Sequence, residues 1–205
     1  GEYDEVDIIL PFINNAKQIE VIKKGYKDND GNVLVPSLEQ AIDQVKKGKT
    51  KARIAAMIET PSAAIYADEI AGEIEGPVII DTDNLTMTVW ASVDRDVSRP
   101  TGFRDAYLDL KLWQKDIFKF APPEVIGLVI EAVQKVKAKK PGRKVFLIVN
   151  NVRDQELLQA AQYSGVDSVI FKYDAANPQM MQLATIAAAQ AAVTTVVADR
   201  AQVGV

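Results

Sequence analysis

Carboxylate and amide side chains follow two apolar segments of this sequence. The segment 81–84, Asp-Thr-Asp-Asn, comes directly after the apolar run 78–80, and Glu59 ends the run 52–58. Short apolar runs that end in polar residues are typical of parallel strands, whose carboxyl ends hold the sites of α/β enzymes. Oxygen ligands of this kind suit Mg²⁺ or another hard cation. The sequence therefore predicts a metal or phosphate site at these two strand ends.

The same side chains also have a purely structural use. Asp83 and Asn84 could cap a helix that begins near Leu85, since both residue types accept hydrogen bonds from the first N–H groups of a helix. Asn150 and Asn151 could start the next predicted helix in the same way, with Asn151 as its cap. The polar clusters alone do not separate these uses from ligand binding.

Composition limits the chemistry that this chain can perform. The 205 residues include no cysteine and no histidine, which removes disulfides, thiolate ligands and the commonest general base. Catalysis would have to use carboxylates, lysine, tyrosine, serine or threonine, or an oxygen-ligated cation. A net charge of −4 with 48% hydrophobic residues predicts a globular protein with no nucleic-acid or membrane partner. No signal peptide or membrane-spanning segment is recognisable, so a cytoplasmic location is expected.

Apolar runs alternate with segments of helical period, which predicts repeated βα units. We predict strands at 6–13, 52–59, 77–81, 144–150 and 167–171. We predict helices at 15–26, 37–48, 61–73, 123–139 and 153–165, a short helix from 85, and a closing helix from 178 to beyond 193. Such an α/β chain could form an open doubly wound sheet or part of a (β/α)₈ barrel. The glycine-rich phosphate loop of a dinucleotide fold is absent after every strand.

The segment 57–71, MIETPSAAIYADEIA, resembles a motif of the C-terminal barrel domain of the phosphoenolpyruvate (PEP)-utilising enzymes, closest to PEP synthase-like homologues. Further matching segments stand in the family order, DTDNLTM at 81–87 and DRD at 94–96. The resemblance implies a partial TIM-type barrel, with strands four to eight in residues 1–190 and an extension at 191–205. It also implies that three more strands and further domains of the same polypeptide precede Gly1.

In the family, a glutamate and an aspartate at neighbouring strand ends bind the Mg²⁺ that orients PEP or pyruvate. Glu59 matches the first ligand by motif. At the second, the family order Asn-Asp is reversed here, so an amide stands at the place of the carboxylate. The resemblance therefore implies a metal site drawn from Glu59, Asp81, Asp83 and Asn84. It implies substrate contacts from Thr82, Asp83 and Arg95.

The family's proton donor, a cysteine after the strand that corresponds to 144–150, is missing. Val149 and Asn150 occupy this place, and asparagine cannot deliver a proton. Two functions therefore remain open. The first is the PEP- or pyruvate-binding barrel domain of a PEP synthase-like phosphotransferase. The second is a catalytically impaired homologue that serves assembly or ligand binding.

Two other segments carry predictions about partners. The aromatic-rich segment 103–123 is expected to act as a lid over the site or to pack against a neighbouring domain or subunit. The closing helix has no charged face, and such a helix is normally buried. A subunit interface is its natural partner, with core packing as the alternative. We therefore expect a homo-oligomer.

Overall fold

The structure, a computed structural model, describes residues 5–45, 51–91 and 102–171. The closing helix from 178 and the extension 191–205 lie outside these residues and stay predictions. Within the described ranges, no helix is both long and apolar enough to cross a lipid bilayer.

A single parallel sheet forms the centre of the molecule. Its strands are β1 (Glu5–Leu10), β4 (Lys51–Ile58), β5 (Val78–Asp81), β6 (Val145–Val149) and β7 (Ser168–Phe171). All neighbours are parallel and follow the order β1-β4-β5-β6-β7, so each strand lies beside its predecessor in the chain. A doubly wound sheet reverses its order at a switch point, whereas a barrel does not. The five strands confirm the predicted α/β class and have the order of a barrel arc.

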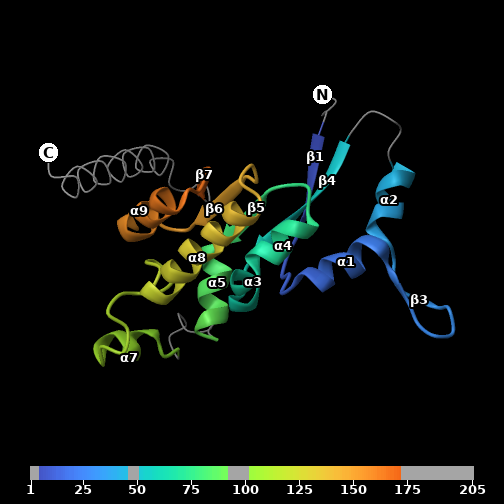
Figure 1. The fold of residues 1–205 in the computed structure, drawn as a ribbon. Coiled ribbons are helices and arrows are strands. Elements are labelled where there is room, and N and C mark those ends of the chain that lie inside the picture. The colour runs from blue at the N-terminus through green and yellow to red at the C-terminus, as the bar shows by residue number, and fades with distance from the viewer. Residues whose placement is uncertain (1–4, 46–50, 92–101, 172–205) are drawn as a thin grey trace, which may run out of the picture.

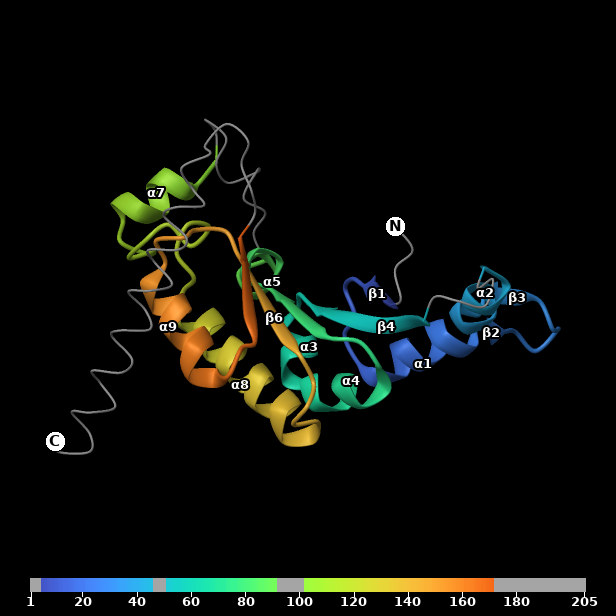
Figure 2. The ribbon, with the colours of Figure 1, turned by 90° about the horizontal axis from the view of Figure 1, so that it is seen from above.

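The helices that connect these strands lie on one side of the sheet. They are α1 (Ala16–Lys24), α3 (Pro61–Ile65), α4 (Ala67–Glu73), α8 (Pro123–Lys139) and α9 (Gln155–Ser164). Figure 2 shows α1, α4, α8 and α9 against the same face. Right-handed crossovers that always advance in one direction must place every helix on that face. Figure 1 shows α5 (Thr82–Val89) and α7 (Arg104–Asp109) near the carboxyl ends of the strands.

The alternation of side chains along the strands separates a covered face from a bare one. On β6, Val145, Leu147 and Val149 are buried in the main core, while Phe146 and Ile148 point the other way and are half-buried. On the outer strands the bare face is open to solvent. Ile9 is 44% exposed and Ile170 is 42% exposed. An apolar sheet face is stable when another layer covers it, and in a closed barrel this face would be the interior.

The excursion between β1 and β4 contains a tight turn, with Gly31 at a φ of 84°. An antiparallel hairpin of β2 (Tyr26–Lys27) and β3 (Val33–Val35) is followed by α2 (Leu38–Val45). Ser37 Oγ accepts a hydrogen bond from the Gln40 N–H at 3.2 Å, which confirms the predicted start of this helix.

Four predicted helix boundaries were wrong. The helix predicted at 15–26 ends at Lys24, and Tyr26 begins β2. The helix predicted at 61–73 is broken into α3 and α4 at Tyr66. The helix predicted from Leu85 begins at Thr82, because Asp81 and not Asp83 or Asn84 caps it. The helix predicted from 153 begins at Gln155, because Asp154 and not Asn151 is its cap. In each capping case, an acidic residue one turn away from the predicted cap reaches the free N–H groups.

Arg143, which precedes β6, caps the carboxyl end of α4. Its guanidinium donates hydrogen bonds to the carbonyls of Ala71 at 3.3 Å, Ile74 at 2.5 Å and Gly76 at 2.8 Å, and to that of Glu75. Ala71 lies in the last turn of α4 and Ile74 is its C-cap, where carbonyls have no intrahelical partner, whereas Glu75 and Gly76 lie in the loop beyond. One side chain therefore joins the start of β6 to the loop that leads into β5.

We expect Arg143→Met to lower the free energy of unfolding by about 2 kcal/mol, because several half-buried carbonyls lose a charged donor. Urea unfolding followed by circular dichroism measures the change. Lys140→Met, at an exposed position nearby, is the matched control and should shift stability by less than about 0.5 kcal/mol. Equal losses in both variants would contradict the capping role.

Asp167 makes the chain's stability sensitive to acid. Burial raises the pKa of its carboxyl, but hydrogen bonds from Lys137 at 2.5 Å, Lys144 at 2.9 Å and the Val145 N–H at 2.8 Å outweigh burial. The pKa of Asp167 therefore lies well below its usual value. A carboxyl with a lowered folded-state pKa stabilises the protein above its unfolded pKa, and this contribution fades as the pH falls toward the folded-state pKa.

We expect Asp167→Asn to cost stability at pH 6 and less at pH 3, because the carboxyl begins to lose its advantage below about pH 4. Urea midpoints of the variant and the native chain at both pH values give the comparison. Asp43→Asn, at an exposed position on α2, controls for general effects of charge. A constant difference between the two proteins from pH 6 to pH 3 would rule out the proposed linkage.

Candidate functional site

The predicted site residues meet at the carboxyl end of the sheet. Glu59 follows β4, Asp81 ends β5 and Asn150 follows β6. The register pairs Ile58 with Ile80 and Asp81 with Ile148, so the three strand ends stand side by side. This confirms the sequence argument that the polar residues after β4 and β5 share one edge of the sheet.

Glu59 is the most buried acidic residue of this edge, with 2% of its surface exposed. Its Oε2 accepts a hydrogen bond from the Phe12 N–H at 2.7 Å, and its Oε1 accepts one from the Asn84 side-chain amide. Thr88 Oγ1 donates to the Glu59 carbonyl at 2.8 Å. Glu59 therefore joins the end of β4 to the segment after β1 and to α5.

Asp81 and Thr82 are committed to the start of α5. Asp81 Oδ1 accepts hydrogen bonds from the N–H groups of Asp83 at 2.9 Å and Asn84 at 3.4 Å, which caps the helix. Thr82 Oγ1 donates to the carbonyl of Ile148 at 2.8 Å and so ties the helix to β6. Two of the predicted site residues therefore perform the structural work of a strand-to-helix turn.

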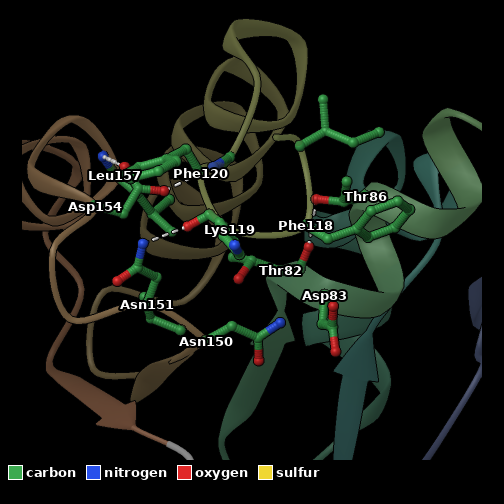
Figure 3. Close-up of a pocket in the computed structure, with 13 residues that line it drawn as sticks. Thr82, Asp83, Thr86, Phe118, Lys119, Phe120, Asn150, Asn151, Asp154 and Leu157 are labelled. Atoms are coloured by element: carbon green, nitrogen blue, oxygen red, sulfur yellow. Dashed lines mark hydrogen bonds between the residues drawn. The ribbon is translucent and has the colours of Figure 1, made fainter. Parts of the chain in front are cut away.

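A small pocket lies beside this turn, where β5 and β6 end (Figure 3). Thr82, Asp83, Asn150, Asn151 and Lys119 are among the residues that line it. Its volume is about 20 Å³, which is room for about one water molecule. The pocket is therefore too small for a phosphorylated organic acid, and it forms at most one wall of a substrate site.

Residues 117–121 line one side of the pocket. They belong to the segment 115–122, which Asp154 holds in place. Asp154 Oδ2 accepts a hydrogen bond from the Ala121 N–H at 2.7 Å, and its Oδ1 accepts one from the Leu157 N–H at 3.2 Å. Asn151 Nδ2 donates to the Lys119 carbonyl at 2.8 Å. Burial raises the pKa of Asp154. The start of α9 thus ties down the segment over the site.

The aromatic side chains of the segment 103–123 pack together inside this chain. Trp113 is 3% exposed and forms a small second core with Ile117 and Phe118. Its ring lies 5.0 Å from that of Tyr107 and 6.0 Å from that of Trp90, at the end of α5. Much of the aromatic surface that predicted a lid or a partner contact is therefore already covered. Both ideas stay predictions.

The arrangement of side chains does not fit the magnesium ligand set that the sequence predicts. Asn84 turns its NH₂ group to Glu59, and a hydrogen-bond donor cannot ligate a cation. Asp81 uses Oδ1 to cap α5, and Asp83 faces the pocket instead. Within the part of the chain that the structure describes, no three acidic side chains converge as metal ligands do. The metal site stays a prediction of the sequence.

The remaining predicted residues are placed unevenly. Arg95 lies in the range 92–101, outside the described residues. Val149 is buried in the main core, whereas Asn150, its neighbour at the predicted proton-donor position, is half-buried and lines the pocket. Sequence reasoning missed Asp154 and Lys119. An acidic residue just before a predicted helix could have indicated Asp154, whereas nothing in the sequence singled out Lys119 among the lysines.

Comparison with known proteins identifies relatives that match most of this chain. A family profile described as "PEP-utilising enzyme, PEP-binding domain" matches residues 2–147. Pyruvate, phosphate dikinase of Clostridium symbiosum is 27% identical over 187 residues, which is 91% of this chain and 19% of that protein. The chloroplastic pyruvate, phosphate dikinase 1 of Arabidopsis thaliana is 31% identical over 150 residues, which is 72% of this chain and 15% of that protein. The chain thus spans about a fifth or less of these relatives.

Solved structures with similar coordinates include a citrate synthase, SbnG, with a TM-score of 0.48 and 18% identity over 90% of this chain and 62% of that chain. A pyruvate kinase from Cryptosporidium parvum has a TM-score of 0.49 and 14% identity over 90% of this chain and 31% of that chain.

We expect Asp154→Ala to lower the free energy of unfolding by about 2 kcal/mol, because α9 loses its cap and the Ala121 N–H loses its acceptor. The segment 115–122 should then open more often, so trypsin should cleave faster after Lys115 and Lys119. Asp105→Ala, at an exposed position on α7, is the control. Unchanged cleavage in a destabilised Asp154 variant would mean that Asp154 stabilises the protein by capping α9 and does not hold the segment 115–122.

Proposed function

Since this chain belongs to the PEP-binding domain family of PEP-utilising enzymes, we propose that it forms part of a barrel that binds PEP or pyruvate in a longer polypeptide. Residues 1–190 would form strands four to eight of that barrel, and 191–205 an extension. The observation that carries this proposal is the sequential parallel sheet with its polar residues gathered at the carboxyl edge. That edge is where barrel enzymes bind their substrates.

The rest of the barrel would come from preceding domains of the same polypeptide. Among the described strands, β1 and β7 form the two edges of the sheet, and one sheet face keeps its apolar side chains exposed. The pocket beside α5 is a single wall of about 20 Å³. Added strands would cover the open face and supply the opposite wall, which fits relatives about five times as long as this chain.

The substrate contacts that we propose lie around this wall. Thr82, Asp83 and Arg95 are the contacts that the sequence predicts. Lys119 is a cationic residue among those that line the pocket, and its Nζ lies 3.7 Å from Asp116 Oδ2. A lysine beside the pocket would attract the carboxylate or phosphate of an anionic substrate. Asn150 stands at the position of the family's proton donor, and an amide cannot deliver a proton.

Two proposals remain for the activity of the whole protein. The first is interconversion of PEP and pyruvate, in which the phosphoryl group passes to or from an acceptor outside this barrel, as in a PEP synthase-like or dikinase-like phosphotransferase. The second is a homologue that binds the ligand or supports assembly without forming pyruvate, with the closing helix in a homo-oligomer. Asn150 at the pocket and the bond between Asn84 and Glu59 favour the second for activity. Binding of PEP or pyruvate is common to the phosphotransferase and to the ligand-binding homologue.

We expect the intact protein to bind PEP, and Lys119→Ala to weaken binding about 5- to 10-fold, because a single exposed cation contributes roughly 1 kcal/mol to anion binding. Isothermal titration calorimetry with PEP and with pyruvate measures this effect. Lys140→Ala, at an exposed position away from the pocket, is the matched control. A well-folded protein that binds neither compound would leave only the assembly role.

A further inference from the structure

We infer that the side-chain amide of Asn84 takes the place of a divalent cation at this site, so that the strand ends are held together without metal. The inference deepens the proposed function, on which it rests, because it states how the PEP- or pyruvate-binding edge is organised. It is carried by Glu59, by the donors that satisfy it, and by the way α5 positions Asn84.

The first step is the set of partners around Glu59. The carboxylate is almost fully buried, and each of its oxygens accepts a hydrogen bond from a different part of the chain. The Phe12 N–H comes from the segment after β1, and the Asn84 amide comes from α5. A metal ion performs the same task when it draws ligands from separate elements to one point. Here two neutral donors perform it.

The second step is the orientation of Asn84. Its backbone N–H faces Asp81 Oδ1 at 3.4 Å, and its carbonyl accepts a hydrogen bond from Thr88 Oγ1 at 3.0 Å, so the first turn of α5 fixes the residue. From this place the NH₂ group donates to Glu59 Oε1. Rotation of the amide would set two oxygens against each other, which is unfavourable unless a cation lies beside both. In this orientation the NH₂ group therefore occupies the place beside Glu59 Oε1 that a cation would need.

The third step is the backbone at Phe12. This residue has a φ of 50°, in the left-handed region that residues other than glycine seldom adopt. Its N–H donates to Glu59 Oε2 at 2.7 Å, so the buried carboxylate holds the strained turn after β1. Loss of the carboxylate's position would release this turn as well as α5. The arrangement therefore depends on Glu59 being kept in place by its two donors.

The inference predicts what an acidic residue at position 84 would do. Asn84→Asp would set a second carboxylate against the buried Glu59, and two like charges at this distance repel. A divalent cation would remove the repulsion and could be ligated by both carboxylates. The variant should therefore depend on metal, whereas the native protein should not.

The test compares the intact native protein with Asn84→Asp and with the double variant Asn84→Asp, Glu59→Gln. Thermal unfolding is recorded in EDTA, in Mg²⁺ and in Mn²⁺, and Mn²⁺ binding is measured by electron paramagnetic resonance. We expect the native protein to melt within about 1 °C in all three solutions. Asn84→Asp should melt at least about 5 °C lower in EDTA and recover in either metal, with Mn²⁺ bound. The double variant should show no recovery.

Two results of the metal experiments would overturn the inference. One is Mn²⁺ binding to the native protein that disappears in Glu59→Gln, and the other is an Asn84→Asp variant that folds but gains no metal response. A PEP titration of the native protein in EDTA separates this inference from the proposed function. Binding of PEP that requires Mg²⁺ would also overturn the inference. Absence of PEP binding in every solution, with the metal results as expected, would count against the proposed function alone.

Discussion

The buried carboxylate of Glu59 organises the carboxyl edge of the sheet. It follows β4 and accepts hydrogen bonds from the segment after β1 and from α5. A carboxylate removed from water is unfavourable unless donors surround it, and here the donors are the Phe12 N–H and the Asn84 amide. Satisfying Glu59 therefore fixes the turn after β1 and the direction of α5. The direction of α5 in turn places Thr82 and Asp83 on the pocket wall. The candidate site is thus a consequence of one charge that the fold has to accommodate.

The winding of the sheet explains why this edge is only part of a site. Strands that follow one another without reversal place the connecting helices on one face and leave the other face without them. The exposed Ile9 and Ile170 show what that face lacks, which is a second layer or the remainder of a barrel. The shallow pocket has the same origin, since only one wall of a barrel mouth is present. Incomplete closure therefore accounts for both features.

The strands and their parallel order could be predicted from the sequence, whereas the helix caps and the partners of Glu59 could not. Apolar runs that alternate with segments of helical period predicted the strands and their parallel order, because strands of a parallel sheet are largely apolar. The caps were misplaced because Asp81, Asp83 and Asn84 are all good capping residues, and only the geometry of the turn selects Asp81. The partners of Glu59 could not be predicted either. Phe12 contributes a backbone N–H, which has no sequence signature, and lies 47 positions away.

Amide side chains replace charged or proton-donating chemistry at two neighbouring strand ends. Asn84 stands where the motif resemblance predicts a carboxylate, and Asn150 stands where it predicts an acid. The two changes are physically compatible, because a hydrogen bond from Asn84 keeps Glu59 satisfied without a cation, and an enolate that no cation stabilises has little use for a proton donor. An amide-rich edge can still hold an anion through hydrogen bonds and Lys119. If the chain binds PEP or pyruvate without forming pyruvate, as in the second proposal above, the two changes belong together.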